Sequence, residues 1–146
     1  MTQAVASILL DTNIFIYAHG RPHLYKEPCR LLLARVAETT PKYNIDVELL
    51  QEILHVYNGR GARGFGLAIF DILLDLFADP FPVRRSEMVA AREVLERYPV
   101  LSPRDAIHVA VVSAQRLEGI VTTDAAFGQV HGLSVFDPIA LASDSS

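Results

Sequence analysis

Short apolar segments that alternate with helical patterns constrain the fold of this chain more than any other feature. Ile8 to Leu10 are apolar and end at Asp11, and two similar segments, GIVTTD and LSVFDP, end at Asp124 and Asp137. Apolar runs of this length between turn signals are typical of buried strands. Strands that alternate with helices are joined by helical crossovers and lie parallel. The sequence therefore predicts an α/β fold with a short, mostly parallel central sheet.

The segments between these strands show the 3.6-residue period of amphipathic helices. The pattern predicts helices over residues 27–38, 47–57, 67–77, 86–98 and 102–117, with caps at Asp46, Ser86 and Ser102. It predicts a turn at 41–44, a loop over the glycine-rich stretch NGRGARGFG (58–66), and a short edge strand at 81–83. No internal repeat or long linker interrupts this order, which is typical of one domain.

Length and composition limit the class of protein. A chain of 146 residues with 51% apolar content fits one compact domain, which we expect to span residues 1–142, followed by a disordered tail at 143–146. The single cysteine, Cys29, excludes an intramolecular disulfide and gives no support to a Cys-rich zinc site. No apolar run approaches the roughly 20 residues of a membrane-spanning helix, and the start MTQAVAS lacks the positive charge of a secretory signal. We therefore expect a soluble cytoplasmic protein without membrane association.

Two of the acids stand where predicted strands end. In open parallel sheets the working crevice lies beyond the carboxyl ends of the strands, so Asp11 and Asp124 are expected there. Asp105 occupies the first turn of the helix that starts at Ser102, a helix that is apolar on nearly all sides. On the helical wheel of residues 47–57, Glu52 lies nearer the apolar face than Glu48, which is expected to be solvated. Taken alone, Asp105 is explained as a capping-box acid and Asp124 as a turn or N-cap residue.

Taken together, the acids indicate a metal site. Two carboxylates about 4 Å apart repel by on the order of 4 kcal/mol at an effective dielectric near 20. Several such pairs do not persist ionised without a cation or a bound proton. Oxygen ligands with no nearby cysteine are what Mg²⁺ or Mn²⁺ prefers. The sequence therefore predicts a hard divalent cation in the crevice.

Four pieces of the chain resemble, in order, the PIN-domain family and within it the VapC-like toxin ribonucleases: ILLDTNIFIY, VELLQEILHVY, LSPRDAIHVAVV and IVTTDAAFGQVHGLSVFDP. The resemblance implies a Rossmann-like three-layer α/β/α sandwich. It implies catalytic, metal-binding acids at Asp11, Glu52, Asp105 and Asp124, with Mg²⁺ or Mn²⁺ as the cofactor. Family neighbours of these acids match Thr12, Asn13 and Thr123, which are expected to contact metal-bound water or phosphate.

The resemblance also implies an activity and partners. The expected function is metal-dependent hydrolysis of RNA phosphodiester bonds by the toxin of a type II toxin–antitoxin pair. Attack by water rather than by the ribose 2′-hydroxyl would leave a 5′-phosphate and a 3′-hydroxyl. An antitoxin protein and a second copy of the chain are the expected protein partners, because the apolar helix stripes exceed what a small sheet needs. An antitoxin arginine inserted into the acidic site is a hypothesis drawn from the family.

Basic residues give a weaker signal. The net charge of −4 argues weakly against a nucleic-acid partner, yet all but two of the 13 basic residues are arginine, which suits phosphate recognition. Arg60 and Arg63 in the glycine-rich stretch are candidate RNA contacts, and a solvated connection explains them equally well. We expect His108 to be a packed helix residue; contact with a substrate phosphate is the less favoured alternative.

Two rival functions are weighed against the nuclease. A phosphatase of the haloacid-dehalogenase type needs a second aspartate where this chain has Asn13, and a suitably placed lysine, which neither Lys26 nor Lys42 supplies. The stronger rival is a non-catalytic PIN-like module that binds RNA or a protein. The presence of all four acids speaks against it.

Overall fold

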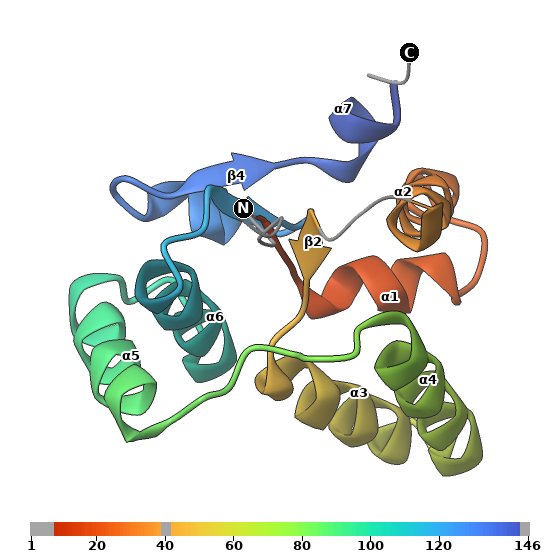
Figure 1. The fold of residues 1–146 in the computed structure, drawn as a ribbon, viewed down its shortest axis with the longest axis horizontal. Helices are drawn as coiled ribbons and strands as arrows, with labels where there is room; N and C mark the ends of the chain where they lie inside the picture. The colour runs from red at the N-terminus through yellow and green to blue at the C-terminus, as the bar shows by residue number, and fades with distance from the viewer. Residues whose placement is uncertain (1–7, 39–41, 144–146) are drawn as a thin grey trace, which may run out of the picture.

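A parallel four-stranded sheet forms the centre of the computed structural model, which describes residues 8–38 and 42–143 (Figure 1). The strand order is β2–β1–β3–β4, with β1 at Ile8–Leu10, β2 at Tyr43–Asn44, β3 at Gly119–Val121 and β4 at Ser134–Phe136. In β1, Leu9 stands opposite Ile120 of β3, and every neighbouring pair of strands is parallel. The predicted parallel sheet is confirmed.

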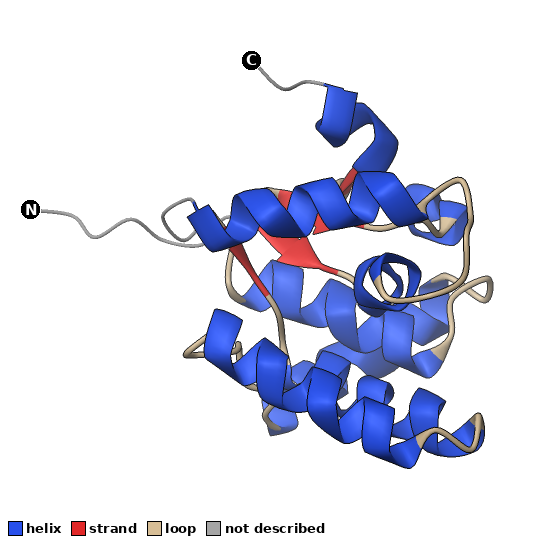
Figure 2. Cartoon of the chain, turned by 90° about the vertical axis from the view of Figure 1, so that its right-hand side faces the viewer, coloured by secondary structure: helices blue, strands red, loops and turns tan. Residues whose placement is uncertain are grey.

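Helices account for most of the described chain and enclose this short sheet (Figure 2). They are α1 (Thr12–Ala18), α2 (Lys26–Glu38), α3 (Val47–Gly59), α4 (Arg63–Leu76), α5 (Arg85–Arg97), α6 (Pro103–Ala114) and α7 (Pro138–Ser143), with a 3₁₀ helix, η1, at Ala125–Gln129. Side chains of β1 alternate between two cores. Ile8 and Leu10 pack with α1 to α4, whereas Leu9 packs with α6 and η1. The result is the expected three-layer α/β/α arrangement.

Several local predictions are wrong, and tertiary packing explains each of them. Residues Tyr43 and Asn44 form β2 rather than a turn, because they pair with β1; Pro41 lies outside the described residues. The segment after Asp11 forms helix α1, which the pattern did not assign. Around Phe81 there is only an isolated bridge to Asp46 in place of a strand.

Two helix boundaries also differ from expectation. Helix α5 begins after Arg84 rather than Ser86, because the Glu87 carboxylate accepts a hydrogen bond from the Arg84 backbone N–H. Helix α6 begins after Ser102 as predicted but ends at Ala114, three residues before the expected end.

At the carboxyl end of the chain, α7 includes Ser143, which was assigned to the tail, and residues 144–146 lie outside the described part. Among the described helices, none is long and apolar enough to cross a membrane.

The glycine-rich stretch is mostly helical rather than a loop. Helix α3 continues to Gly59 and α4 starts at Arg63, which leaves residues 60–62 as the connection. Glycine is a poor helix former, so packing must stabilise α4 here. Ile69 and Leu73 of α4 are buried in the core. Gly66 is also buried, and a Cβ atom built on it would lie only 2.7 Å from the Tyr57 Cβ, so its lack of a side chain permits the close approach of α3 and α4.

Substitution of Gly66 tests this packing argument. We expect Gly66→Ala to lower the free energy of unfolding by about 1–3 kcal/mol, because the added methyl group forces the two helices apart. The matched control is Gly64→Ala in the same helix, where a Cβ meets nothing within 4 Å. There the better helix propensity of alanine should stabilise the protein by up to about 1 kcal/mol. Urea unfolding followed by circular dichroism measures both; equal effects would contradict the argument.

Candidate active site at the carboxyl ends of the strands

Asp11 stands directly after β1 and caps the N-terminus of α1. It is buried, with 4% of its surface exposed, and its Oδ1 accepts a hydrogen bond from the Thr12 backbone N–H at 2.7 Å. Burial raises the pKa of Asp11 to about 6, against the opposing effects of His108 and a hydrogen bond from Thr122. The free energy of the fold therefore includes a cost for keeping this carboxylate ionised at neutral pH.

A polar network surrounds the second oxygen of Asp11. The Thr122 hydroxyl donates to Asp11 Oδ2 at 2.7 Å, and the Asn13 amide donates to the same oxygen at 3.2 Å. The Thr122 hydroxyl in turn accepts from the backbone N–H of Asp124 at 3.0 Å. The backbone N–H of Thr123 donates to Asn13 Oδ1, and the predicted contact of Thr123 with metal-bound water or phosphate stays a prediction. The side chain of Thr122, which was not predicted to act here, is the one that bonds Asp11 in the described network.

His108 lies at the centre of a second group of acids. Its imidazole is fully buried, with Nδ1 2.7 Å from Asp46 Oδ2 and Nε2 2.8 Å from Glu52 Oε1. The same Nε2 lies 3.5 Å from Asp11 Oδ1. Burial alone would lower the pKa of His108, but the charge and hydrogen bond of Asp46, with Glu52 and Asp11, raise it well above its usual value. Carboxylate contacts at both ring nitrogens favour the form of His108 in which both nitrogens carry a proton and donate.

Glu52 reaches this site from the middle of α3. Its Oε2 lies 3.9 Å from the Arg104 guanidinium of α6, so the carboxylate stands between two basic side chains of that helix. Its side chain is 12% exposed. Glu48 is half-buried rather than solvated as expected, and burial together with the charge of Glu52 raises its pKa.

The last two predicted acids stand at two further helix starts. Asp105 and Ser102 form a capping box at α6, as their spacing indicates: the Ser102 N–H donates to Asp105, and the Asp105 N–H donates to the Ser102 hydroxyl. Asp124 is exposed and caps η1. Burial raises the pKa of Asp105, and the charge of Asp124 adds to the rise, so the two carboxylates act on each other.

The donor chemistry of the site fits a hard divalent cation. The charge of Glu52 raises the pKa of Asp11, and the charge of Asp124 raises the pKa of Asp105. The charge of His108 lowers both of these pKa values. Thr12 Oγ1 is buried beside Asp11 with no hydrogen-bond partner in the described chain. Within residues 8–38 and 42–143, however, no group of three His, Cys, Asp or Glu side chains is already arranged to hold a metal ion. The pKa effects group the four acids in two pairs, Asp11 with Glu52 and Asp105 with Asp124.

The candidate RNA contacts lie elsewhere on the molecule. Arg63 donates to Asn58 Oδ1 through two guanidinium nitrogens, and Arg60 lies over the Tyr57 ring. Both occupy the carboxyl end of α3 and the start of α4, whereas Arg104 is the arginine in contact with a candidate acid.

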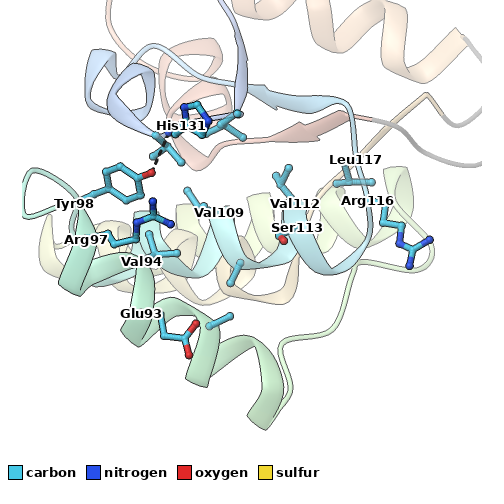
Figure 3. Close-up of a pocket in the computed structure, with 15 residues that line it drawn as sticks. Glu93, Val94, Arg97, Tyr98, Val109, Val112, Ser113, Arg116, Leu117 and His131 are labelled. Carbon is cyan, nitrogen blue, oxygen red and sulfur yellow. Dashed lines mark hydrogen bonds between the residues drawn. The ribbon is translucent and has the colours of Figure 1, made fainter.

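A cavity of about 430 Å³ lies between α5, α6 and the segment before β4 (Figure 3). Its lining includes Tyr98, Arg97, Arg116 and His131, and the Tyr98 hydroxyl accepts a hydrogen bond from the His131 backbone N–H. None of the four predicted acids lines it. The cavity is therefore separate from the candidate active site.

Comparison with known proteins decides the family. The family model of the PIN domain matches residues 8–133. The chain belongs to the PIN domain family. Ribonuclease VapC13 of Mycobacterium tuberculosis is 32% identical over 126 residues, which cover 86% of this chain and 96% of that relative. Ribonuclease VapC23 of the same organism is 32% identical over 117 residues, covering 80% and 92%.

Solved structures share the fold of this PIN domain. The crystal structure of Mycobacterium tuberculosis VapC20, a Sarcin-Ricin loop cleaving toxin, matches with a TM-score of 0.72 at 20% identity and covers 88% of this chain and 97% of that chain. A toxin–antitoxin complex from Klebsiella pneumoniae matches with a TM-score of 0.65 at 21% identity, covering 90% and 98%.

Two side chains at the centre of the site were not predicted to act there. Asp46 was identified only as the cap of α3, and His108 only as a packed residue; both descriptions are correct but incomplete. The two residues are 62 positions apart in the sequence, and no local pattern around either one indicates that they make contact. The one available signal is the presence of a histidine on a helix whose other central residues are apolar.

A substitution at Thr122 tests the network around Asp11. Thr122→Val keeps the side-chain volume but removes the hydroxyl, which leaves a buried carboxylate without one of its donors. We expect the free energy of unfolding at pH 7 to fall by about 1–3 kcal/mol. Thr123→Val is the matched control, with an expected change within about 0.5 kcal/mol. Urea unfolding compares them, and a Thr122 variant as stable as its control would show that this hydroxyl does not hold Asp11.

Proposed function

We propose that this PIN domain is a divalent-metal-dependent endoribonuclease and the toxin of a type II toxin–antitoxin pair. One observation carries the proposal: the chain is 32% identical to a VapC ribonuclease over most of its length. The contact of His108 with both Asp11 and Glu52 supports it, as does the effect of Asp124 on the pKa of Asp105. Burial disfavours the charge of Asp11, and a divalent cation would favour that charge beyond what His108 and the hydrogen bond from Thr122 supply.

Asp11, Glu52, Asp105 and Asp124 are the residues that would hold Mg²⁺ or Mn²⁺. When bound, such an ion supplies charge neutralisation at a phosphate and a water of lowered pKa. The donor set consists of carboxylate oxygens only, which suits these two ions rather than zinc.

The other side chains of the site have roles that follow from their contacts. Thr122 and Asn13 hold the Asp11 carboxylate in one orientation, so that its lone pairs face a defined direction. Arg104 is half-buried at the rim beside Glu52, where its guanidinium is available to a phosphate oxygen of the substrate. The attack of water on the phosphodiester would leave a 5′-phosphate and a 3′-hydroxyl.

RNA, an antitoxin and a second copy of the chain are the proposed partners. Phe65, Leu67, Ile72 and Leu74 of α4 are exposed, which supports a protein partner on this helix. Arg60 and Arg63 at the start of the same helix remain candidate contacts for RNA. The family neighbours include toxin–antitoxin complexes, which is the reason to propose an antitoxin rather than an unrelated protein.

Asp11→Asn tests the nuclease directly. We expect metal-dependent cleavage of RNA to fall by at least about 100-fold, since even residues that only support metal ligands account for 10–100-fold. The amide removes a charge that burial disfavours but also replaces an oxygen that accepts hydrogen bonds, so cleavage is compared at equal folded fraction. The assay incubates structured and unstructured RNA with Mg²⁺, Mn²⁺ or EDTA and follows urea unfolding in parallel. Asp71→Asn, an exposed residue of α4, is the control and should cleave like the wild type.

The same variant separates the nuclease from the non-catalytic module. RNA binding that is unaffected by Asp11→Asn, with no cleavage of any RNA by the wild type, would overturn the nuclease and favour the module. Expression in a bacterial host adds a test of the toxin: the wild type should arrest growth, and Asp11→Asn should relieve the arrest.

A further inference from the structure

The contact between Asp46 and His108 has no part in the predicted set of metal-binding acids. His108 is fully buried, and its two ring nitrogens are each within 2.8 Å of a carboxylate oxygen, Asp46 on one side and Glu52 on the other. A short hydrogen bond at each nitrogen fixes both the position and the rotation of the ring. The position of Asp46 therefore determines the orientation of the ring, and the ring in turn determines the position of the Glu52 carboxylate.

Asp46 is itself held firmly. Its Oδ1 accepts from the Leu49 N–H at 3.0 Å as the cap of α3, while Oδ2 faces His108. The backbone on either side pairs with Phe81: the Phe81 N–H donates to Ile45 O at 2.9 Å, and the Val47 N–H donates to Phe81 O at 3.0 Å. The side chain is fully buried. Asp46 is thus a fixed point from which the orientation of His108 is set.

Stability alone does not explain a buried hydrogen-bonded pair at this place. Replacing both partners of such a pair by apolar groups of the same shape is often nearly neutral or stabilising. The neighbours of His108 on α6 are apolar and buried, so the helix would pack with an apolar residue there. What an apolar residue cannot do is donate a hydrogen bond to Glu52.

We propose that Asp46 and His108 are a positioning pair, in which Asp46 orients His108 and His108 holds the Glu52 carboxylate beside Asp11 for a divalent cation. This inference rests on the proposed function. The distances support it: one nitrogen, Nε2, lies 2.8 Å from Glu52 and 3.5 Å from Asp11, so the ring brings acids from β1 and α3 to the same place. Neither Asp46 nor His108 needs to touch the cation or the substrate.

Two substitutions of Asp46 separate positioning from helix capping. Serine and asparagine both cap helices well, so Asp46→Ser and Asp46→Asn each keep the bond to the Leu49 N–H. Only asparagine is long enough to reach His108 as well, where its amide donates to Nδ1 while Nε2–H still donates to Glu52. The two variants share the cap and differ in the contact to the ring.

The readout is the dissociation constant for Mn²⁺, measured by electron paramagnetic resonance of free Mn²⁺ well below the unfolding temperature. We expect Asp46→Ser to weaken Mn²⁺ binding by about 10-fold or more and Asp46→Asn to recover most of that loss, as for other residues that orient metal ligands. The loss of RNA cleavage in Asp46→Ser should be smaller at saturating Mn²⁺ than at low Mn²⁺. Asp137→Ser, at the start of α7, removes a carboxylate that bonds the Ile139 N–H and should leave Mn²⁺ affinity unchanged.

The outcomes distinguish this inference from the proposed function. A folded Asp46→Ser protein that binds Mn²⁺ like the wild type, or an Asp46→Asn protein as weak as Asp46→Ser, overturns the positioning pair while the nuclease stands. A wild type that neither binds Mn²⁺ nor cleaves RNA overturns both.

If Asp46→Ser does not fold, a second pair of variants tests the inference. His108→Gln places an amide near Nε2 and keeps a donor to Glu52, whereas His108→Asn places it near Nδ1 and keeps only the contact to Asp46. We expect His108→Asn to lose more Mn²⁺ affinity than His108→Gln. The reverse order, or equal affinities, overturns the inference.

Discussion

The fully buried imidazole of His108 joins the parts of the molecule on which the site depends. It stands on α6 and contacts Asp46 before α3, Glu52 within α3, and Asp11 after β1. Two of these are hydrogen bonds shorter than 3 Å to a fully buried ring, and buried hydrogen bonds are strong whereas an unpaired buried polar group is costly. The relative placement of α3, α6 and the end of β1 at this point therefore follows from one side chain.

The acids gather where helices begin. Asp11 caps α1, Asp46 caps α3 and Asp124 caps η1, while Asp105 lies in the first turn of α6. Helix N-termini carry partial positive charge and unpaired N–H groups, so each carboxylate is favoured at its own position. Capping and metal binding are thus compatible uses of the same residues. The capping explanations of Asp105 and Asp124 are correct, and they do not exclude the proposed role of these acids in metal binding.

Local patterns predicted the parallel sheet, the capping box of Ser102 and the position of Asp11, because period and spacing are properties of neighbouring residues. Strand β2 at Tyr43–Asn44 was missed because pairing with β1 creates it. The glycine-rich stretch was assigned to a loop because the contact of Gly66 with Tyr57 is invisible along the chain. The pairing of Asp46 with His108 was missed for the same reason.

Diffraction from crystals soaked in Mn²⁺, at a wavelength where manganese scatters anomalously, tests the gathering of the acids around one cation most directly. We expect an anomalous peak bounded by Asp11, Glu52, Asp105 and Asp124, with His108 still bonded to Asp46 and Glu52. A peak elsewhere with none in this crevice, or Glu52 and Asp105 turned away from Asp11 and Asp124, would contradict it.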